Sequence, residues 1–466
     1  MSAKAQRLFV IGTAALLLLN LLQAAFTEPL DDETYYWMYS QYLDWGYFDH
    51  PPMVALMIRA GYTLFHNTIG LRLFSVLATF GSAFIMLRLI EDRQPLRLLC
   101  IILSVAFIQL GGFLAVPDAA LVFFSSVFLL CFHRFLLANS LTNAILLGAC
   151  MAVLLYSKYQ GLLLIVLCLI ANLNLLRNKY FWLSVLTGVI LFLPHLYWQY
   201  RHGFPPLRYF LADQYAGKTY HFYTTTDYIA GQLFFFGPLI GWMVFLAAFS
   251  KKTASNTWTR TLKFIVIGVT GFFFLVSFKG VVEPNWTAVA IVPAILLLHA
   301  YLETAPKLER LMYGLTPFSI LLMMMVRIAF IWDLVGDRVG LNKEIHDSEK
   351  WTGFVKTRAG NYPVLFVDSY QRASKYVFYQ KESAGSYNGR DYRNNQYDIW
   401  HFDKAWEQDS VLVVTLWKMK ENSDSLDCSQ GRLYTCMFAN PNIGQSDLYQ
   451  KLPPRKALVP FFKKRK

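Results

Sequence analysis

The sequence predicts a mainly α-helical fold: a polytopic membrane bundle of about eleven transmembrane helices, followed by a small extracytoplasmic α/β domain. The 466 residues are 55% hydrophobic and only 16% charged, with a mean hydropathy of +0.35, which is more apolar than an average water-soluble protein. Apolar segments long enough to cross a bilayer recur from Leu8–Phe26 as far as Trp332. After that point no such segment is found.

Basic residues fall at every second gap between the apolar segments, as the positive-inside rule requires of cytoplasmic loops. We therefore expect a multi-pass membrane protein with its N-terminus inside and its C-terminus outside. The net charge of +13 does not indicate nucleic-acid binding, because the basic residues form no stripe on one soluble face. The cytoplasmic gaps hold Lys4 and Arg7; Arg88, Arg93 and Arg97; Arg134; Arg177 and Lys179; Lys251, Lys252, Arg260 and Lys263; and Lys307 and Arg310.

The first apolar segment has a second interpretation. Lys4 and Arg7 before it, and the small residues Ala24 and Ala25 near its end, also fit a cleaved signal peptide. The residues that follow the segment would face outward in either case.

Composition changes after Asp333, which predicts a transmembrane domain over residues 1–333 and a soluble extracytoplasmic α/β domain over residues 334–466. The second domain carries half of the acidic residues, 15 of 30. Its strand signals are β-rich runs bounded by polar residues. Residues 362–379 indicate a strand followed by a helix, and residues 410–417 and 431–438 indicate further strands.

Two outward segments of the transmembrane domain, 28–69 and 201–227, are too long to be simple turns. They predict a structured outer vestibule.

Six cysteines make no disulfide framework in a chain of this length. Cys428 and Cys436 lie in the polar C-terminal region, which the topology places in an oxidising compartment if the cell is bacterial, so they predict a local disulfide. Unpaired thiols are the alternative.

Acidic residues are concentrated directly after the first apolar segment, in "EPLDDETYYWMYSQYLDWGYFDHPPM" at 28–53. Six of the fifteen acidic residues in the first 333 positions lie there. Charges beside a bilayer tend to mark a site or a pathway, although a hydrated loop would also carry them. Tyr35, Tyr36 and Trp37 follow the first acids and offer flat faces to a sugar ring. The paired prolines after Asp49 and His50 restrict the backbone there.

This stretch resembles the first outer loop of the glycosyltransferase family that includes the protein O-mannosyltransferases and the lipid A aminoarabinose transferases, which have the C-type glycosyltransferase fold. Segments "VPDAALVFF", "SKYQGLLLI", "FKGVVEPNWTAVAIVPAILLL" and "VDSYQRASKYVFY" agree with bacterial members in the same order. The resemblance implies transfer of a sugar from a polyprenyl-phosphate carrier to a lipid, glycan or protein acceptor outside the cytoplasmic membrane.

The resemblance also implies roles for particular residues. Asp32 corresponds to the catalytic base of the "DE" pair, and Glu33 is its supporting carboxylate. Direct displacement with one base predicts inversion at the anomeric carbon. Tyr35 and Tyr36 are expected to line the substrate site.

Cations aimed at the leaving phosphate would lower the barrier. The candidates are His50, Lys158, Arg201 and Lys279, for which snorkelling to lipid headgroups is the competing explanation.

Further polar residues lie at outward helix ends. Asp118 either contacts substrate or caps a helix. Glu283, Asn285 and Trp286 are expected at the sugar or acceptor, while Trp286 could equally anchor the interface.

No cofactor is required by this chemistry. Asp49 matches an acidic position that some relatives associate with a bound divalent metal, but no clustered metal-ligand spacing accompanies it. We expect a monomer that binds membrane lipids and no nucleic acid.

Two functions of other classes remain open. A transporter or flippase of lipid-linked sugars would place ionisable groups near the bilayer midplane, and the break at Lys158 is its best support. A receptor whose C-terminal domain binds the ligand would need far fewer spans than about eleven.

Overall fold

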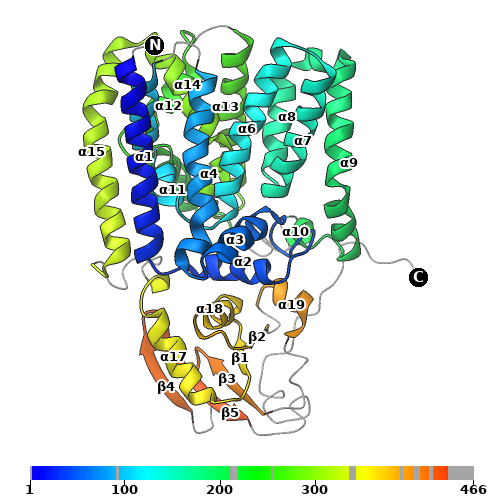
Figure 1. Ribbon diagram of the computed structural model, residues 1–466, viewed down its shortest axis with the longest axis vertical. Coiled ribbons are helices and arrows are strands. Elements are labelled where there is room, and N and C mark those ends of the chain that lie inside the picture. Colours follow the sequence, from blue (N-terminus) through cyan, green and yellow to red (C-terminus); the bar gives the residue numbers. More distant parts are fainter. Residues whose placement is uncertain are drawn as a thin grey trace. The chain divides into compact units, whose positions relative to one another are not determined.

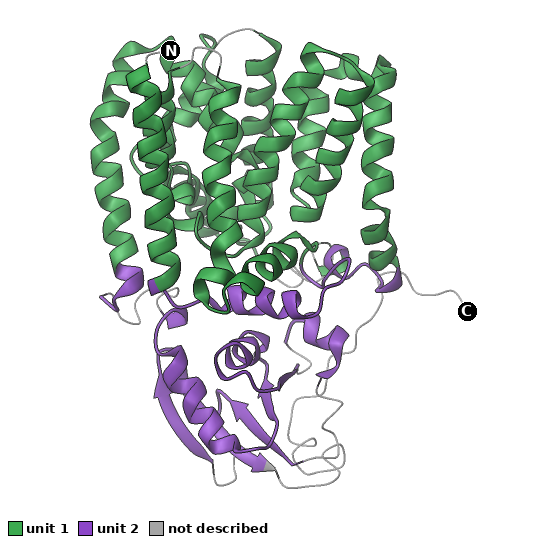
Figure 2. Cartoon of the chain, in the orientation of Figure 1, with its two compact units in different colours: residues 1–25, 50–200, 208–328 green, residues 26–49, 201–207, 329–466 purple. Residues whose placement is uncertain are grey.

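The computed structural model describes residues 3–90, 94–209, 211, 219–253, 256–334, 343–388, 392–402, 410–418 and 423–438. Packing divides the chain into two compact units, which Figure 2 colours separately. Unit 1 comprises residues 1–25, 50–200 and 208–328, and unit 2 comprises residues 26–49, 201–207 and 329–466.

Unit 1 is helical, and the axes of its long helices are roughly aligned with one another (Figure 1). Within the described residues, seven helices are long and apolar enough to cross a membrane. They are α1 (Ala3–Phe26), α4 (Thr68–Leu89), α6 (Pro117–Leu137), α9 (Lys179–Arg201), α13 (Thr257–Ser277), η4 with α14 (Pro284–Glu303), and α15 (Pro306–Ile331).

Shorter helices complete the bundle. Four are apolar and 10–17 residues long, so the expected number of about eleven spans stays a prediction. These four are α3 (Met53–Leu64), α5 (Pro95–Ser104), α7 (Leu141–Ser157) and α8 (Gly161–Ala171). The others are η1 (Phe107–Gly111), η2 (Leu173–Arg177), α11 (Phe222–Phe235) and α12 (Gly241–Phe249), while most of α10 (Pro205–Arg208) belongs to unit 2.

Local sequence explains where several helices begin. The Asn67, Ser140 and Asn256 side chains accept hydrogen bonds from the backbone N–H three residues on, at 3.1, 3.2 and 2.8 Å, and so cap α4, α7 and α13. A proline begins each of α5, α6 and η4, where its missing N–H has no helical partner to lose.

Glycines allow α3 and α4 to approach closely. A Cβ at Gly61 would lie 2.2 Å from the carbonyl oxygen of Gly70, and a Cβ at Gly70 would lie 1.7 Å from that of Phe65. Small residues permit such backbone contact between membrane helices. The contact therefore fixes the position of α3 against α4.

Unit 2 combines the outer-loop helix α2 (Asp31–Gln41) with a small α/β fold. The five-stranded sheet has the order β2-β1-β3-β5-β4, with β1 parallel to β2 and β3, and β5 antiparallel to β3 and β4. Its elements are α17 (Ser348–Ala359), β1 (Val364–Val367), α18 (Tyr370–Gln380), β2 (Ala384–Tyr387), α19 (Gln396–Trp400), β3 (Val411–Thr415), β4 (Asp424–Cys428) and β5 (Gly431–Phe438).

These elements confirm the predicted fold class. The expected strand and helix of 362–379 are β1 and α18, and the other two expected strands are β3 and β5. The domain boundary at Asp333 stays a prediction, because the packing unit that holds the sheet also includes residues 26–49. Of the predicted outer loop 201–227, positions 210 and 212–218 lie outside the described residues.

The predicted disulfide between Cys428 and Cys436 is wrong for this fold. Neither cysteine is in a disulfide, and the strand register separates them: Cys428 pairs with Gly431, whereas Cys436 pairs with Val413. A strand advances about 3.3 Å per residue, so five positions along β5 exceed the Cα separation of about 7 Å that a disulfide allows. The two cysteines are close in sequence, but they lie at different positions along the extended strands β4 and β5.

Replacing Gly61 tests the close approach of α3 and α4. We expect Gly61→Ala to lower the thermal midpoint of the detergent-purified protein, at a cost of about 1–3 kcal/mol, because the backbone carbonyl it meets cannot rotate away. Gly271→Ala is the matched control, since nothing lies within 4 Å of a Cβ added there. Equal midpoints for the two variants would contradict this packing.

Candidate active site

The acidic stretch of the outer loop begins helix α2, and its acids differ in environment. Glu33 is fully buried, and its Oε2 accepts a hydrogen bond from the Leu30 N–H at 3.0 Å. This is the side-chain arrangement of a helix start, in which a residue in the first turn satisfies a backbone donor just before the helix. Glu33 therefore orients the helix that carries Asp32.

Asp31 is held by the C-terminal part of unit 2. The fully buried Lys375 on α18 forms an ion pair with Asp31 at 2.5 Å. Gln430 donates to the same carboxylate at 3.0 Å, and the Asp31 N–H donates to Glu344 at 3.3 Å. These bonds connect the first residue of α2 to three separate segments of unit 2, so they fix the start of the helix against those segments.

Asp32 differs from both neighbours because its side chain is exposed. Among the described residues, none forms a hydrogen bond or an ion pair with its carboxylate. A carboxylate that is accessible and makes no such bond can accept a proton from an incoming hydroxyl.

The surroundings of Asp32 raise the pKa of its carboxyl to about 6. Desolvation by the surrounding protein is the largest cause; Asp31, Asp49 and Glu33 add repulsion, while the Arg393 guanidinium opposes the rise. The Asp32 carboxylate is exposed to solvent. Protein atoms around it nevertheless replace much of the water that would otherwise screen its charge.

Asp49 is the most highly bonded acid of the loop. One of its oxygens accepts hydrogen bonds from the phenols of Tyr35 at 2.9 Å and Tyr39 at 3.1 Å, and the other pairs with Arg393. Burial raises the pKa of Tyr35 and Tyr39 well above the usual range, so both remain protonated donors. A metal ion at Asp49 would have to compete with three partners.

A second set of contacts locks this arrangement. The Gln396 N–H donates to the Tyr35 hydroxyl at 2.8 Å, and the Gln396 side chain accepts from the Phe48 N–H at 2.8 Å. The Tyr370 ring lies 4.4 Å from that of Tyr35, and the Arg393 guanidinium lies 5.1 Å from the centre of the Tyr370 ring. The buried Tyr35 therefore connects Asp49 to Gln396, and Tyr36 beside it is also buried.

Unit 1 brings three other predicted site residues together. Lys158, at the end of α7, forms a buried ion pair with Asp118 at 2.7 Å, and Asn285 donates to the other Asp118 oxygen at 3.0 Å. Asp118 is thus engaged across helices, and the N-terminal residue that flanks α6, Val116, makes no side-chain capping bond. The Lys158 ammonium already has an anionic partner, so its role toward a phosphate stays a prediction.

The remaining predicted residues differ in burial. Lys279 and Glu283 are exposed at the turn between α13 and η4, and Arg201 is exposed at the end of α9. His50 is half-buried before α3. Trp286 is half-buried and its ring lies 5.9 Å from that of Phe273, as expected of a packing residue.

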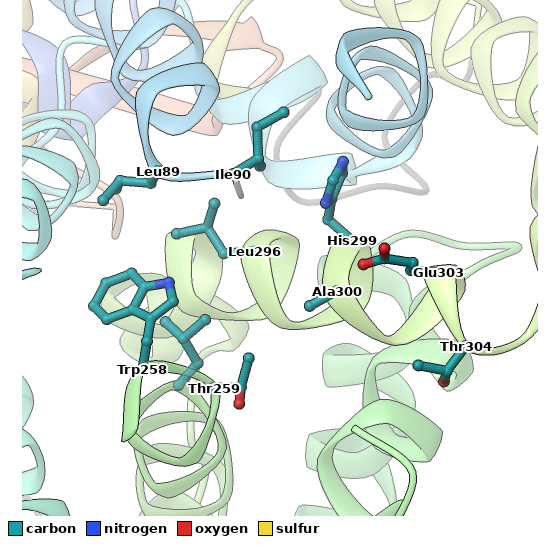
Figure 3. A pocket seen from close by; sticks show the side chains of 10 residues that line it. Leu89, Ile90, Trp258, Thr259, Leu296, His299, Ala300, Glu303 and Thr304 are labelled. Carbon is teal, nitrogen blue, oxygen red and sulfur yellow. The ribbon is translucent and has the colours of Figure 1, made fainter. Parts of the chain in front are cut away.

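A pocket of unit 1 contains none of the predicted residues. It lies where α14 meets α4 and α13, with Leu89, Leu296 and Trp258 on its apolar side and His299 and Glu303 opposite (Figure 3). The candidate site therefore depends on the carboxylates rather than on this pocket.

No group of three or more His, Cys, Asp or Glu side chains is placed to hold a metal ion within the part of the chain that the structure describes. The expectation of an optional divalent metal at Asp49 therefore gains no support from clustering, and it stays a prediction.

Sequence reasoning missed four residues of the site: Tyr39, Tyr370, Lys375 and Arg393. Tyr370 and Lys375 belong to the segment "VDSYQRASKYVFY" that carried part of the family resemblance, so a signal existed for them. Arg393 lies in a polar segment without a motif, and only the fold places its guanidinium at Asp49.

Charge removal tests the buried pair of unit 1. Lys158→Met leaves the Asp118 carboxylate buried without its cation, so we expect a loss of about 3–5 kcal/mol, seen as a lower thermal midpoint. The double variant Asp118→Asn/Lys158→Met removes both charges and should recover most of the loss. If the single variant were as stable as the double one, the two charges would not form a buried pair.

Comparisons with known proteins agree with this architecture. Residues 49–198 match the family model described as dolichyl-phosphate-mannose-protein mannosyltransferase. The chain is 23% identical over 310 residues to the lipid A galacturonosyltransferase RgtD of Rhizobium johnstonii. That match covers 64% of this chain and 65% of RgtD, slightly less than two thirds of the relative's length.

Two solved structures share the fold over nearly the whole chain. ArnT from Cupriavidus metallidurans bound to undecaprenyl phosphate has a TM-score of 0.63 at 15% identity, covering 92% of this chain and 98% of ArnT. The apo state of ArnT has a TM-score of 0.62 at 15% identity, covering 93% and 98%. With the family match, these findings confirm the resemblance: the chain has the C-type fold and is similar to the PMT and ArnT glycosyltransferases.

Proposed function

We propose that the protein is a membrane glycosyltransferase that moves a sugar from a polyprenyl-phosphate carrier to a lipid acceptor on the outer face of the bacterial inner membrane. The observation that carries the proposal is Asp32, the acid of the loop that is exposed and has no hydrogen-bond or ion-pair partner among the described residues. ArnT bound to undecaprenyl phosphate supports the class of donor, and RgtD, a lipid A galacturonosyltransferase, supports a lipid acceptor.

In the proposed reaction, Asp32 accepts the proton of the acceptor hydroxyl as its oxygen attacks the anomeric carbon of the donor. The bond from that carbon to the phosphate oxygen breaks, and its electron pair leaves with the polyprenyl phosphate. Attack opposite the leaving group inverts the anomeric configuration. Glu33 keeps the helix start in place without entering the reaction.

The raised pKa of Asp32 suits this role. A carboxyl group with a pKa of about 6 is mostly ionised at neutral pH, yet it is a stronger base than an ordinary aspartate. Lys279, Arg201, His50 and Lys158 remain the residues that we expect at the donor phosphate, and Lys158 would reach it while paired with Asp118. We also expect a monomer that needs no cofactor.

Removing the base tests the proposal directly. Asp32→Asn should reduce sugar transfer by about 10²- to 10⁴-fold, the usual contribution of a positioned general base, measured with purified protein, carrier-linked sugar and lipid acceptor. Asp44→Asn is the matched control, because Asp44 is an exposed acid of the same loop. Full turnover by Asp32→Asn would reject Asp32 as the base. Carrier translocation without any transferred product would favour the transporter instead.

The proposal also predicts the pH dependence of the reaction. Because Asp32 must be ionised to accept a proton, kcat/KM should rise with pH through an apparent pKa of about 6 and then level off. Transfer rates measured from about pH 5 to about pH 8 provide the test. A flat profile over that range would contradict a base with a raised pKa.

A further inference from the structure

The acids around Asp32 pose an electrostatic problem. Asp31, Glu33 and Asp49 all raise the energy of a negative charge on Asp32, and each is held in place by other bonds. Like charges this close favour the protonated carboxylic acid, which cannot act as a base. Some cation must therefore offset the repulsion if Asp32 is to be ionised in this setting.

Lys375 does not provide that charge for Asp32. Its ammonium is fully buried and pairs with Asp31 on one side and the Glu344 carbonyl on the other. The Lys375 side chain is 0% exposed beside Asp31, whereas the Asp32 carboxylate is exposed, so this ammonium does not face it. Glu344 adds a further carboxyl group near Asp31 and Asp32 rather than a cation.

Arg393 is placed to offset the repulsion between Asp32 and the surrounding acids. It pairs with Asp49, lies over the Tyr370 ring at 5.1 Å, and retains a side chain that is 33% exposed. Tyr35, which donates to Asp49, lies one helical turn after Asp32, so α2 places Asp32 beside the Asp49–Arg393 pair. Arg393 is always charged, so its guanidinium attracts the Asp32 carboxylate without a hydrogen bond between them.

Resting on the proposed function, we propose that Arg393 is a positioning residue for the transfer reaction: its guanidinium holds Asp49 and keeps the Asp32 carboxylate ionised among the surrounding acids. The C-terminal sequence thereby supplies a charge on which the outer-loop base depends. The groups that face Asp32 are Asp31, Glu33 and Asp49 from the outer loop, and Tyr370, Arg393 and Glu344 from the C-terminal part of unit 2.

The test is the pH profile of Arg393 variants. In Arg393→Gln the acid limb of kcat/KM should move to higher pH by about one unit, which is about a tenfold loss below the limb, with recovery at alkaline pH. Arg393→Lys keeps the charge and should move the limb less. Arg358→Gln is the control, since Arg358 forms an exposed ion pair with Asp424 and should leave the limb in place.

A uniform loss of activity at every pH in Arg393→Gln, or an unchanged limb, would overturn the proposal. The uniform loss would mean that Arg393 only holds the fold together. If Arg393→Gln fails to insert, Arg393→Met, which also removes the charge, replaces it in the same test.

A measurement without substrate separates this inference from the proposed function. At about pH 8, Asp32→Asn should raise the thermal midpoint more in the Arg393→Gln background than in the wild type, because the uncompensated charge costs more there. Equal effects in the two backgrounds would exclude the coupling. If the wild type transfers no sugar while the coupling is present, the proposed function fails and the pairing stands.

Discussion

The candidate site depends on how the fold distributes partners among closely spaced carboxylates. Asp31 is neutralised by the buried Lys375, Glu33 is bonded to the backbone before its own helix, and Asp49 receives two phenols and Arg393. Asp32 is the member for which no such bond is described. Buried carboxylates without partners are costly, so the ordered ones define the helix, and the accessible one is left to react.

Charged side chains among the apolar helices of unit 1 also need partners. Lys158 and Asp118 are expensive charges in an apolar bundle, and they are tolerated because they pair at 2.7 Å and because Asn285 satisfies the second carboxylate oxygen. The pair joins the end of α7 to the start of α6. Sequence reasoning selected all three residues, but treated them separately as substrate contacts.

Much of the architecture was readable from pattern. The apolar segments predicted the membrane helices, and the β-rich runs predicted β1, β3 and β5, because hydrophobic periodicity is a local property. The number of spans was not readable, since α3, α5, α7 and α8 are apolar but shorter than a bilayer requires. The pairing of Cys428 with Cys436 failed for a similar reason: residue types do not say which positions of two strands are opposite each other.

By itself, the sequence determined a helical membrane protein, an acidic outer loop with Asp32 in a family motif, and a C-terminal α/β segment. Only the tertiary structure decided that Asp31 and Asp49 are bound by Lys375 and Arg393 from more than 300 positions further along the chain. Charge pairing over such separations depends on how elements pack in space. A local pattern carries no information about a partner that folding brings near.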